Sequence, residues 1–116
     1  EAVLAGLAAE GVRPDQIALH FHDTYGQALA NVRTALDVGV REFHASASGL
    51  GRCPFAPGAT GNLATEDLLW MLHGSGYETG IDLQKLIAAS DAVDAAIGRT
   101  SASSVKRALS RQSTGN

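Results

Sequence analysis

The chain has 116 residues, of which 45% are hydrophobic and 18% are charged, and this composition excludes a disordered chain or a coiled coil. The formal net charge of −3 gives no electrostatic footprint for nucleic acid or an anionic membrane, and no apolar run approaches the roughly 20 residues that span a bilayer. The single cysteine excludes an internal disulfide, which fits a reducing compartment.

The first half of the chain predicts a strand–helix–strand unit. An Ala- and Leu-rich helix ends near residue 10, and residues 16–22 alternate as in a strand. Residues 27–38 repeat apolar side chains at helical spacing, and residues 40–46 predict a second strand. Two strands joined through one helix within about 30 residues imply a parallel pair.

The second half predicts a long loop followed by helices. Residues 49–61 are rich in glycine and proline, and loops of this length in compact domains are usually functional. One helix is expected to start at Asn62 or Thr65 as its N-cap, and Asp82 is expected to cap another that ends near Ile97. A short helical stretch at 105–109 should precede a frayed polar tail at 110–116.

Several side chains are assigned to the core or the surface from helical spacing. The residues expected to face inward are Leu68, Leu69, Trp70, Met71, Leu72, Leu83, Leu86, Ile87, Val93 and Ile97. The basic residues Lys106, Arg107 and Arg111 are expected to lie in solvent near a helix end, as is His73. Two parallel strands are too few for an independent sheet, since parallel sheets are normally covered by helices on both faces. With Glu1 opening directly into a helical pattern, the chain reads as an incomplete piece of a larger α/β protein.

The segment His20-Phe21-His22 is the sharpest chemical signal. Residues i and i+2 share one face of a strand, so two imidazoles can reach one ion at the strand's carboxyl end. Two hydrogen-bonded histidines in a polar interior fit the same pattern equally well. Asp23 is either a helix cap or an acceptor that orients a histidine, and the second reading is slightly favoured. The direction of His44 on the second strand is undetermined.

Cys53 lies in the glycine-rich loop between Arg52 and Pro54. A buried cysteine is normally a small hydrophobic residue. Its position in a polar loop argues against a core role, and the neighbouring cation would favour a reactive thiolate. Asn62, where the loop meets the next helix, reads on its own as a helix cap.

Three stretches together resemble the 3-hydroxy-3-methylglutaryl-CoA lyase family, within the metal-dependent TIM-barrel lyases and synthases. They are residues 20–31 (HFHDTYGQALAN), 49–67 (GLGRCPFAPGATGNLATED) and 79–86 (TGIDLQKL). The start of the first stretch is shared with condensing relatives such as isopropylmalate and citramalate synthases. The second contains the glycine-rich loop 49–61 with Cys53, called the cysteine loop below, and is far more specific to the lyases. The resemblance covers essentially the whole chain.

This resemblance implies that residues 1–116 are the C-terminal part of a (β/α)8 TIM-barrel catalytic domain. It implies that His20, His22 and Asn62 bind Mg²⁺ or Mn²⁺, so that for Asn62 the ligand role now outweighs the cap. It also implies a reaction that cleaves 3-hydroxy-3-methylglutaryl-CoA to acetyl-CoA and acetoacetate, a step of leucine degradation and ketone-body formation. Cys53 would be the catalytic acid that protonates the enolate, and His20 would act as both ligand and proton relay.

Two positions depart from the family pattern, which usually has aspartate at His44 and glycine at Arg52. Both leave room for altered substrate preference or weakened activity. The family's fourth metal ligand, an aspartate, and its catalytic arginine belong to a first barrel strand outside this sequence. The segment by itself is therefore expected to be inactive.

Two alternatives to the lyase stay open. One is an acyl-CoA condensing synthase of the same superfamily, against which the cysteine loop argues. The other is a truncated, non-catalytic domain that binds metal or a partner. Expected partners are an acyl-CoA substrate and a second copy in a homo-oligomer, with no nucleic acid and no membrane. The expected compartment is the cytoplasm, or the mitochondrial matrix in a eukaryote.

Overall fold

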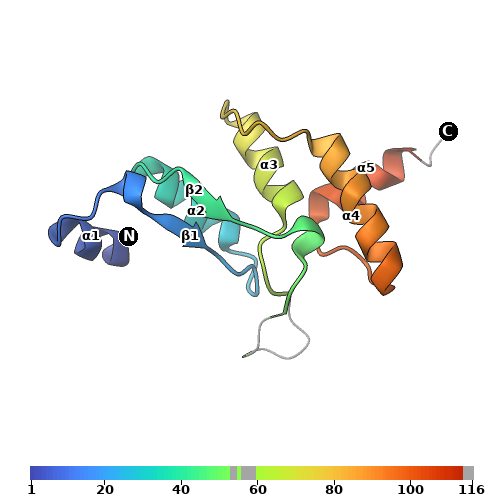
Figure 1. The fold of residues 1–116 in the computed structure, drawn as a ribbon, viewed down its shortest axis with the longest axis horizontal. Coiled ribbons are helices and arrows are strands. Elements are labelled where there is room, and N and C mark those ends of the chain that lie inside the picture. The colour runs from blue at the N-terminus through green and yellow to red at the C-terminus, as the bar shows by residue number, and fades with distance from the viewer. Residues whose placement is uncertain (53–54, 56–59, 114–116) are drawn as a thin grey trace.

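The computed structural model describes residues 1–52, 55 and 60–113, and it forms an elongated molecule of 53 × 35 × 19 Å (Figure 1). Helix α1 lies at one end, the two strands with α2 occupy the middle, and three helices form the other end. The helices and strands are α1 (Ala2–Ala9), β1 (Ala18–His20), α2 (Ala28–Asp37), β2 (Glu42–His44), α3 (Thr65–Gly74), α4 (Leu83–Ile97) and α5 (Ser104–Ser113). Two 3-10 turns, η1 (Pro14–Gln16) and η2 (Ala47–Gly49), complete the order.

Strands β1 and β2 pair in parallel, as the sequence predicts. The register aligns Leu19 with Phe43 and His20 with His44. Both strands are shorter than the expected ranges 16–22 and 40–46, because the residues on either side of the three aligned pairs do not continue the pairing between the two strands. His22 instead pairs with Asn62, and Ser46 pairs with Ala64, in single bridges to the segment that follows the loop. The chain after the loop is thereby held against the carboxyl ends of both strands.

The hydrophobic core lies between α2 and α3. Its buried members are Ala28, Val32, Leu36, Leu63, Leu68 and Leu72. Phe21, directly after β1, and Phe43 of β2 pack against this cluster while remaining partly exposed. The expected helical spacing of α2 is confirmed, since its apolar residues fall on the buried face.

Acidic side chains organise the three C-terminal helices. Asp82 caps α4 as predicted, accepting a 3.0 Å hydrogen bond from the Lys85 backbone N–H. Asp67 accepts hydrogen bonds from the Val105 N–H at 2.9 Å and the Ser103 hydroxyl at 2.7 Å, so it holds the start of α5. That helix runs past the expected stretch 105–109 into the segment expected as a tail, whose residues 114–116 lie outside the described residues.

The expectation that Asn62 or Thr65 caps α3 is wrong. The helix starts at Thr65 after Ala64, and no side chain caps it. The amide of Asn62 is directed instead to a backbone carbonyl within the loop, as described below.

Three inward assignments are also wrong: Trp70 is 57% exposed, Val93 41% and Ile97 56%. Trp70 lies on the side of α3 away from the core residues. The buried face of α4 proves to be mainly polar, with Ile87 followed by Ser90 and Asp94 one and two turns later. The expectation of a solvent-exposed Lys106 is wrong for the same reason, because this side chain meets that polar face and is 4% exposed.

Across the described ranges, no helix is long and apolar enough to cross a membrane.

Candidate metal centre and cysteine loop

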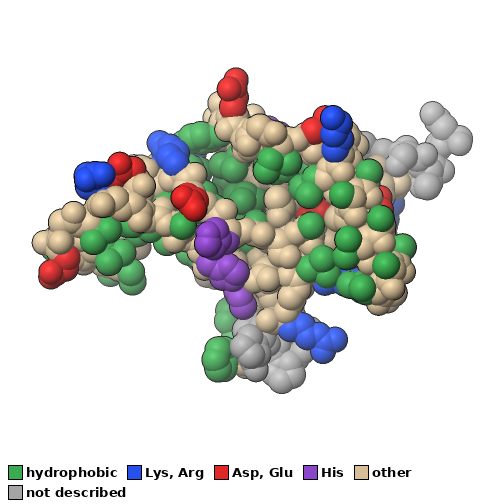
Figure 2. Space-filling view, in the orientation of Figure 1, with side chains coloured by type: hydrophobic (Ala, Val, Ile, Leu, Met, Phe, Trp, Pro, Cys, Tyr) green, Lys and Arg blue, Asp and Glu red, His purple; other side chains and the backbone are tan. Residues whose placement is uncertain are grey.

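Three histidines gather at the carboxyl ends of the parallel strands. His20 and His44 are the aligned last residues of β1 and β2, and His22 lies two residues beyond His20 on the same face. The ring of His20 is 5.2 Å from that of His22 and 6.2 Å from that of His44, between centroids. All three side chains are exposed, and Figure 2 shows histidines in one patch at the centre of the molecule. The sequence left the direction of His44 open, and the structure places it beside His20.

The segment after the loop brings Asn62 to this patch. The backbone of Asn62 forms an antiparallel bridge with that of His22. Hydrogen bonds on either side fix the pairing, since Asp23 N–H donates to the Gly61 carbonyl at 2.8 Å. Three further hydrogen bonds belong to this pairing. The Leu63 N–H donates to the Phe21 carbonyl at 3.2 Å. The Thr24 hydroxyl donates to the Thr60 carbonyl and the Thr60 hydroxyl to the Asp23 carbonyl, both at 3.1 Å. Backbone pairing therefore sets the position of Asn62 relative to His22.

The orientation of the Asn62 amide follows from its contact with the loop. Its Nδ2 donates a 2.8 Å hydrogen bond to the Leu50 carbonyl. Only the NH₂ group of an amide can donate to a carbonyl, so Oδ1 is the atom left to accept or to ligate. Gly51 lies against the same amide with φ at +116°, and a Cβ there would overlap Nδ2. A glycine is thus needed at position 51 for the amide to reach Leu50.

Asp23 supports the start of α2 through its side chain. Its Oδ1 accepts a 3.0 Å hydrogen bond from the N–H of Ala28, the first residue of that helix. This bond agrees with the reading of Asp23 as a support for the start of α2, and the reading of Asp23 as an acceptor for a histidine stays a prediction.

The donors at this patch suit a hard or borderline divalent cation. Imidazole nitrogens and an amide oxygen are ligand types that divalent metal ions accept, and the exposure of the histidines leaves positions for water or substrate oxygens. Within residues 1–52, 55 and 60–113, no three His, Cys, Asp or Glu side chains are grouped closely enough to hold a metal ion.

The two ends of the cysteine loop are held together, although Cys53 itself lies outside the described residues. Arg52 forms an antiparallel bridge with Thr60. A Cβ on Gly61 would lie 2.7 Å from both the Arg52 carbonyl carbon and the Gly51 oxygen, so the two backbones touch. The loop thus leaves and returns at one point beside Asn62.

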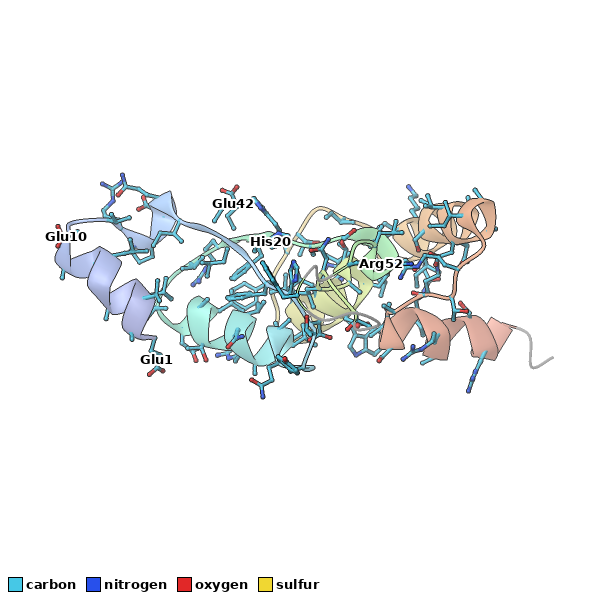
Figure 3. All side chains as sticks on the ribbon, turned by 90° about the horizontal axis from the view of Figure 1, so that it is seen from below. Glu1, Glu10, His20, Glu42 and Arg52 are labelled. Carbon is cyan, nitrogen blue, oxygen red and sulfur yellow. The ribbon has the colours of Figure 1, made fainter. Side chains whose placement is uncertain are left out.

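A cationic hollow lies next to this point. A cavity of about 680 Å³ is lined by Arg52, Arg99 and Arg107 together with small and hydroxyl-bearing residues of the loop and the α4–α5 connection. Figure 3 labels His20 and Arg52, which both lie in the middle of the molecule. Sequence reasoning did not find this cavity, because its arginines come from separate elements with no shared motif.

Two parallel strands with helices after each, and polar side chains beyond the strands' carboxyl ends, are the arrangement of a TIM barrel's catalytic face. The chain aligns with a Bacillus subtilis 3-hydroxy-3-methylglutaryl-CoA lyase structure at a TM-score of 0.90 and 44% identity, covering 95% of this chain and 37% of that one. It also aligns with an Acinetobacter baumannii enzyme solved with coenzyme A and 3-methylmalate, at a TM-score of 0.79 and 45% identity, covering 91% and 34%. The expected fold, part of a TIM barrel, is confirmed.

Residues 3–93 match the HMGL-like family, and the chain belongs to it. Among its relatives, the mitochondrial hydroxymethylglutaryl-CoA lyase of Arabidopsis thaliana is 49% identical over 98% of this chain and 23% of its own length. The cytoplasmic 3-hydroxy-3-methylglutaryl-CoA lyase of Rattus norvegicus is 50% identical over 84% and 28%. The chain therefore spans about a quarter of these relatives, which act in different compartments by name. The family is one of metal-dependent enzymes.

Proposed function

We propose that this chain carries metal-binding and catalytic residues of a lyase that cleaves 3-hydroxy-3-methylglutaryl-CoA to acetyl-CoA and acetoacetate. The observation that carries the proposal is the backbone pairing of Asn62 with His22, whose ring lies 5.2 Å from that of His20. Family membership and the lyase relatives supply the reaction. No observation favours the condensing synthase.

In this proposal His20, His22 and Asn62 hold Mg²⁺ or Mn²⁺. When bound, the cation would draw charge from the substrate's hydroxyl and carbonyl oxygens and offset the negative charge that develops there. The Leu50 carbonyl keeps Nδ2 of Asn62 occupied, which leaves Oδ1 as the amide atom available for the ligand role. We also assign to His20, on the basis of the family resemblance, the relay of the proton that leaves the substrate's 3-hydroxyl; its ring has those of His22 and His44 as neighbours.

Loss of that proton lets the bond between C2 and C3 break, giving the ketone of acetoacetate and the enolate of acetyl-CoA. The enolate carbon must then gain a proton. We assign this donation to the thiol of Cys53, on the basis of the family's cysteine loop. The cavity bordered by Arg52, Arg99 and Arg107 supports an anionic CoA substrate, because guanidinium groups attract phosphates.

The proposal is tested on the protein at its full natural length. Purified protein should release acetoacetate from 3-hydroxy-3-methylglutaryl-CoA, lose this activity with a chelator and regain it with Mn²⁺ or Mg²⁺. Protein that binds Mn²⁺ without cleaving would support a non-catalytic metal-binding domain. Protein that instead condenses acetyl-CoA with a 2-oxo acid would support the synthase.

A further inference from the structure

A buried ion pair joins α4 to α5, away from the histidines. The ammonium of Lys106 on α5 donates to Asp94 Oδ2 at 2.8 Å and to the Ser90 hydroxyl at 2.9 Å, and lies 2.9 Å from an Asp91 oxygen. Lys106 is 4% exposed and Asp94 7%. A buried charge pair is often no more stabilising than well-packed apolar residues, so burial alone gives little reason for this one. The proposed chemistry does not use either residue.

Both groups are charged at neutral pH. Desolvation, the largest single influence, acts to raise the pKa of Asp94, but the hydrogen bonds and charge of Lys106, with Ser48 and Arg99, together hold that pKa below its usual range. Desolvation likewise acts to lower the pKa of Lys106, yet the carboxylates of Asp94 and Asp91 keep it above its usual value. The cluster is therefore a fixed ion pair in the physiological range.

Both members of the ion pair form hydrogen bonds with the side chain of Ser48, which lies in the turn η2. The Ser48 hydroxyl donates to Asp94 Oδ2, accepts from Lys106 Nζ at 3.4 Å and lies 2.6 Å from the Ser101 hydroxyl. Ser48 is fully buried, and its φ of +58° is uncommon for a residue other than glycine. This hydroxyl therefore ties a strained backbone turn to helices α4 and α5.

The backbone of Ser48 is held as firmly as its side chain. Its N–H donates to both carboxylate oxygens of the buried Glu66, at 2.9 and 2.8 Å. Its carbonyl accepts from Ala102 N–H at 3.1 Å and from an Arg99 Nη2 at 3.3 Å. A Cβ on Gly49 would lie 2.9 Å from the Ala102 Cβ, so the turn rests directly on the α4–α5 connection.

The carbonyl that holds Asn62 lies two residues after Ser48. The turn that ends at Leu50 is fixed by the ion pair on one side and receives Nδ2 of Asn62 on the other. Helix α5 is thus linked to a proposed metal ligand through Asp94, Ser48 and one peptide carbonyl.

We propose that Lys106, Asp94 and Ser48 are positioning residues that hold the Leu50 carbonyl in place and so fix the Asn62 amide for metal binding. This rests on the proposed function, because it takes Asn62 as a ligand. A simpler role, in which the ion pair only attaches α5, makes a different prediction about the metal.

The test measures Mn²⁺ affinity by electron paramagnetic resonance titration of the full-length protein, well below its melting temperature. Lys106→Met should weaken Mn²⁺ binding about tenfold, the low end of what partners outside the ligand set are worth. Lys85→Met is the matched control, because Lys85 is the chain's other lysine and lies exposed on α4. It should leave the affinity unchanged. Ser48→Gly keeps the left-handed backbone while removing the hydroxyl, and it serves if Lys106→Met does not fold.

A double-mutant cycle separates positioning from general loosening. In an Asn62→Ala background, Lys106→Met or Ser48→Gly should have almost no further effect on Mn²⁺ affinity, since the link to the metal is already cut. Losses that simply multiply, or no loss in either single variant while Asn62→Ala weakens binding, would overturn the positioning role and leave the metal site standing. Unchanged affinity in Asn62→Ala would instead overturn the metal site and the positioning role together.

Discussion

The backbones of His22 and Asn62 pair in an antiparallel bridge, although α2, β2 and the cysteine loop lie between these two residues in the sequence. Their relative position is set by peptide hydrogen bonds, which are less free to rearrange than side-chain contacts. The Asn62 amide is fixed again by the Leu50 carbonyl. A metal ion would thus find these two groups already arranged, so little binding energy is spent on ordering them.

Replacing His22 by alanine should weaken Mn²⁺ binding by at least about tenfold, because loss of a ligand should cost no less than loss of a partner outside the ligand set. Turnover should fall with it. His73→Ala is the control, since His73 is exposed at the end of α3 and contacts Thr79 at 2.8 Å. Titration of both variants in the full-length protein decides the matter, and equal affinities would remove His22 from the site.

Gly51→Ala should displace the Asn62 amide, because the added methyl group would overlap Nδ2. We expect the Mn²⁺ affinity to fall about as far as in Asn62→Ala, with the fold retained. The strain of alanine at positive φ needs its own control. Gly80→Ala supplies it, since Gly80 has φ at +71° with no atom within 4 Å of the added position. Mn²⁺ titration of the two variants should separate the contact from the strain, and similar behaviour would contradict the proposed contact.

Local periodicity was enough to predict the strand–helix–strand unit. In α2 the residues Ala28, Val32, Ala35 and Leu36 repeat on one face, and that face is buried. The shared face of His20 and His22 follows from strand geometry alone. The parallel strand pair and the shared face of His20 and His22 could therefore be predicted from the sequence pattern, whereas the position of His44 beside His20 could not.

The spacing of apolar residues within α4 did not predict which face of the helix is buried, because that depends on packing against other helices. Val93 and Ile97 are apolar at helical spacing, yet α4 turns Ser90 and Asp94 inward to meet Lys106, which comes from another helix. The bond from Asn62 to Leu50 uses a peptide carbonyl, which every residue has, so no side chain signals it. The ligand role of Asn62 was reached by resemblance, and the thiol role of Cys53 stays a prediction on the same basis.

Cys53→Ser should lower kcat by about 10²–10⁴-fold, the usual worth of positioned acid–base catalysis, because a serine hydroxyl is a much poorer acid than a thiol. Mn²⁺ affinity should survive, since Cys53 is not among the proposed ligands, and KM should change little. Both quantities are measured on one preparation of the full-length protein. Wild-type kcat in this variant would move the proton-donating role to His20 or to a residue outside this chain.

Asp67→Ala should detach the start of α5. The carboxylate accepts bonds from Ser103, Ser104 and Val105, and loss of a helix cap usually costs about 1–2 kcal/mol. The free energy of unfolding, measured by urea titration, should fall by that amount. Glu78→Ala, which removes an exposed carboxylate, should change it by less than about 0.5 kcal/mol. Equal small effects would mean that α5 is held without Asp67.

The ion pair between Asp94 and Lys106 should make the folded state sensitive to acid. Because the pKa of Asp94 is lower in the folded chain, its carboxylate contributes stability above its unfolded pKa of about 3.9, and this contribution is lost as the pH falls through the folded value. Lys106, with a raised pKa, contributes below about pH 10.4 and loses its share only as the pH rises further. Between about pH 5 and 9 neither group should titrate.

Asp94→Asn isolates the acid limb of this dependence. At neutral pH the variant should be markedly less stable than the wild type, because Lys106 is left buried with a single exposed aspartate as its charge partner. The difference in unfolding free energy should start to shrink below about pH 4, where the unfolded wild-type carboxylate takes up a proton, and it should keep shrinking until the folded carboxylate, with its lowered pKa, is protonated too. Urea titrations from pH 2.5 to 7 should be compared with those of Asp37→Asn, whose exposed pair with Arg33 should be worth little at any pH. A constant difference between Asp94→Asn and wild type across this range would show that Asp94 contributes through shape and not through its charge.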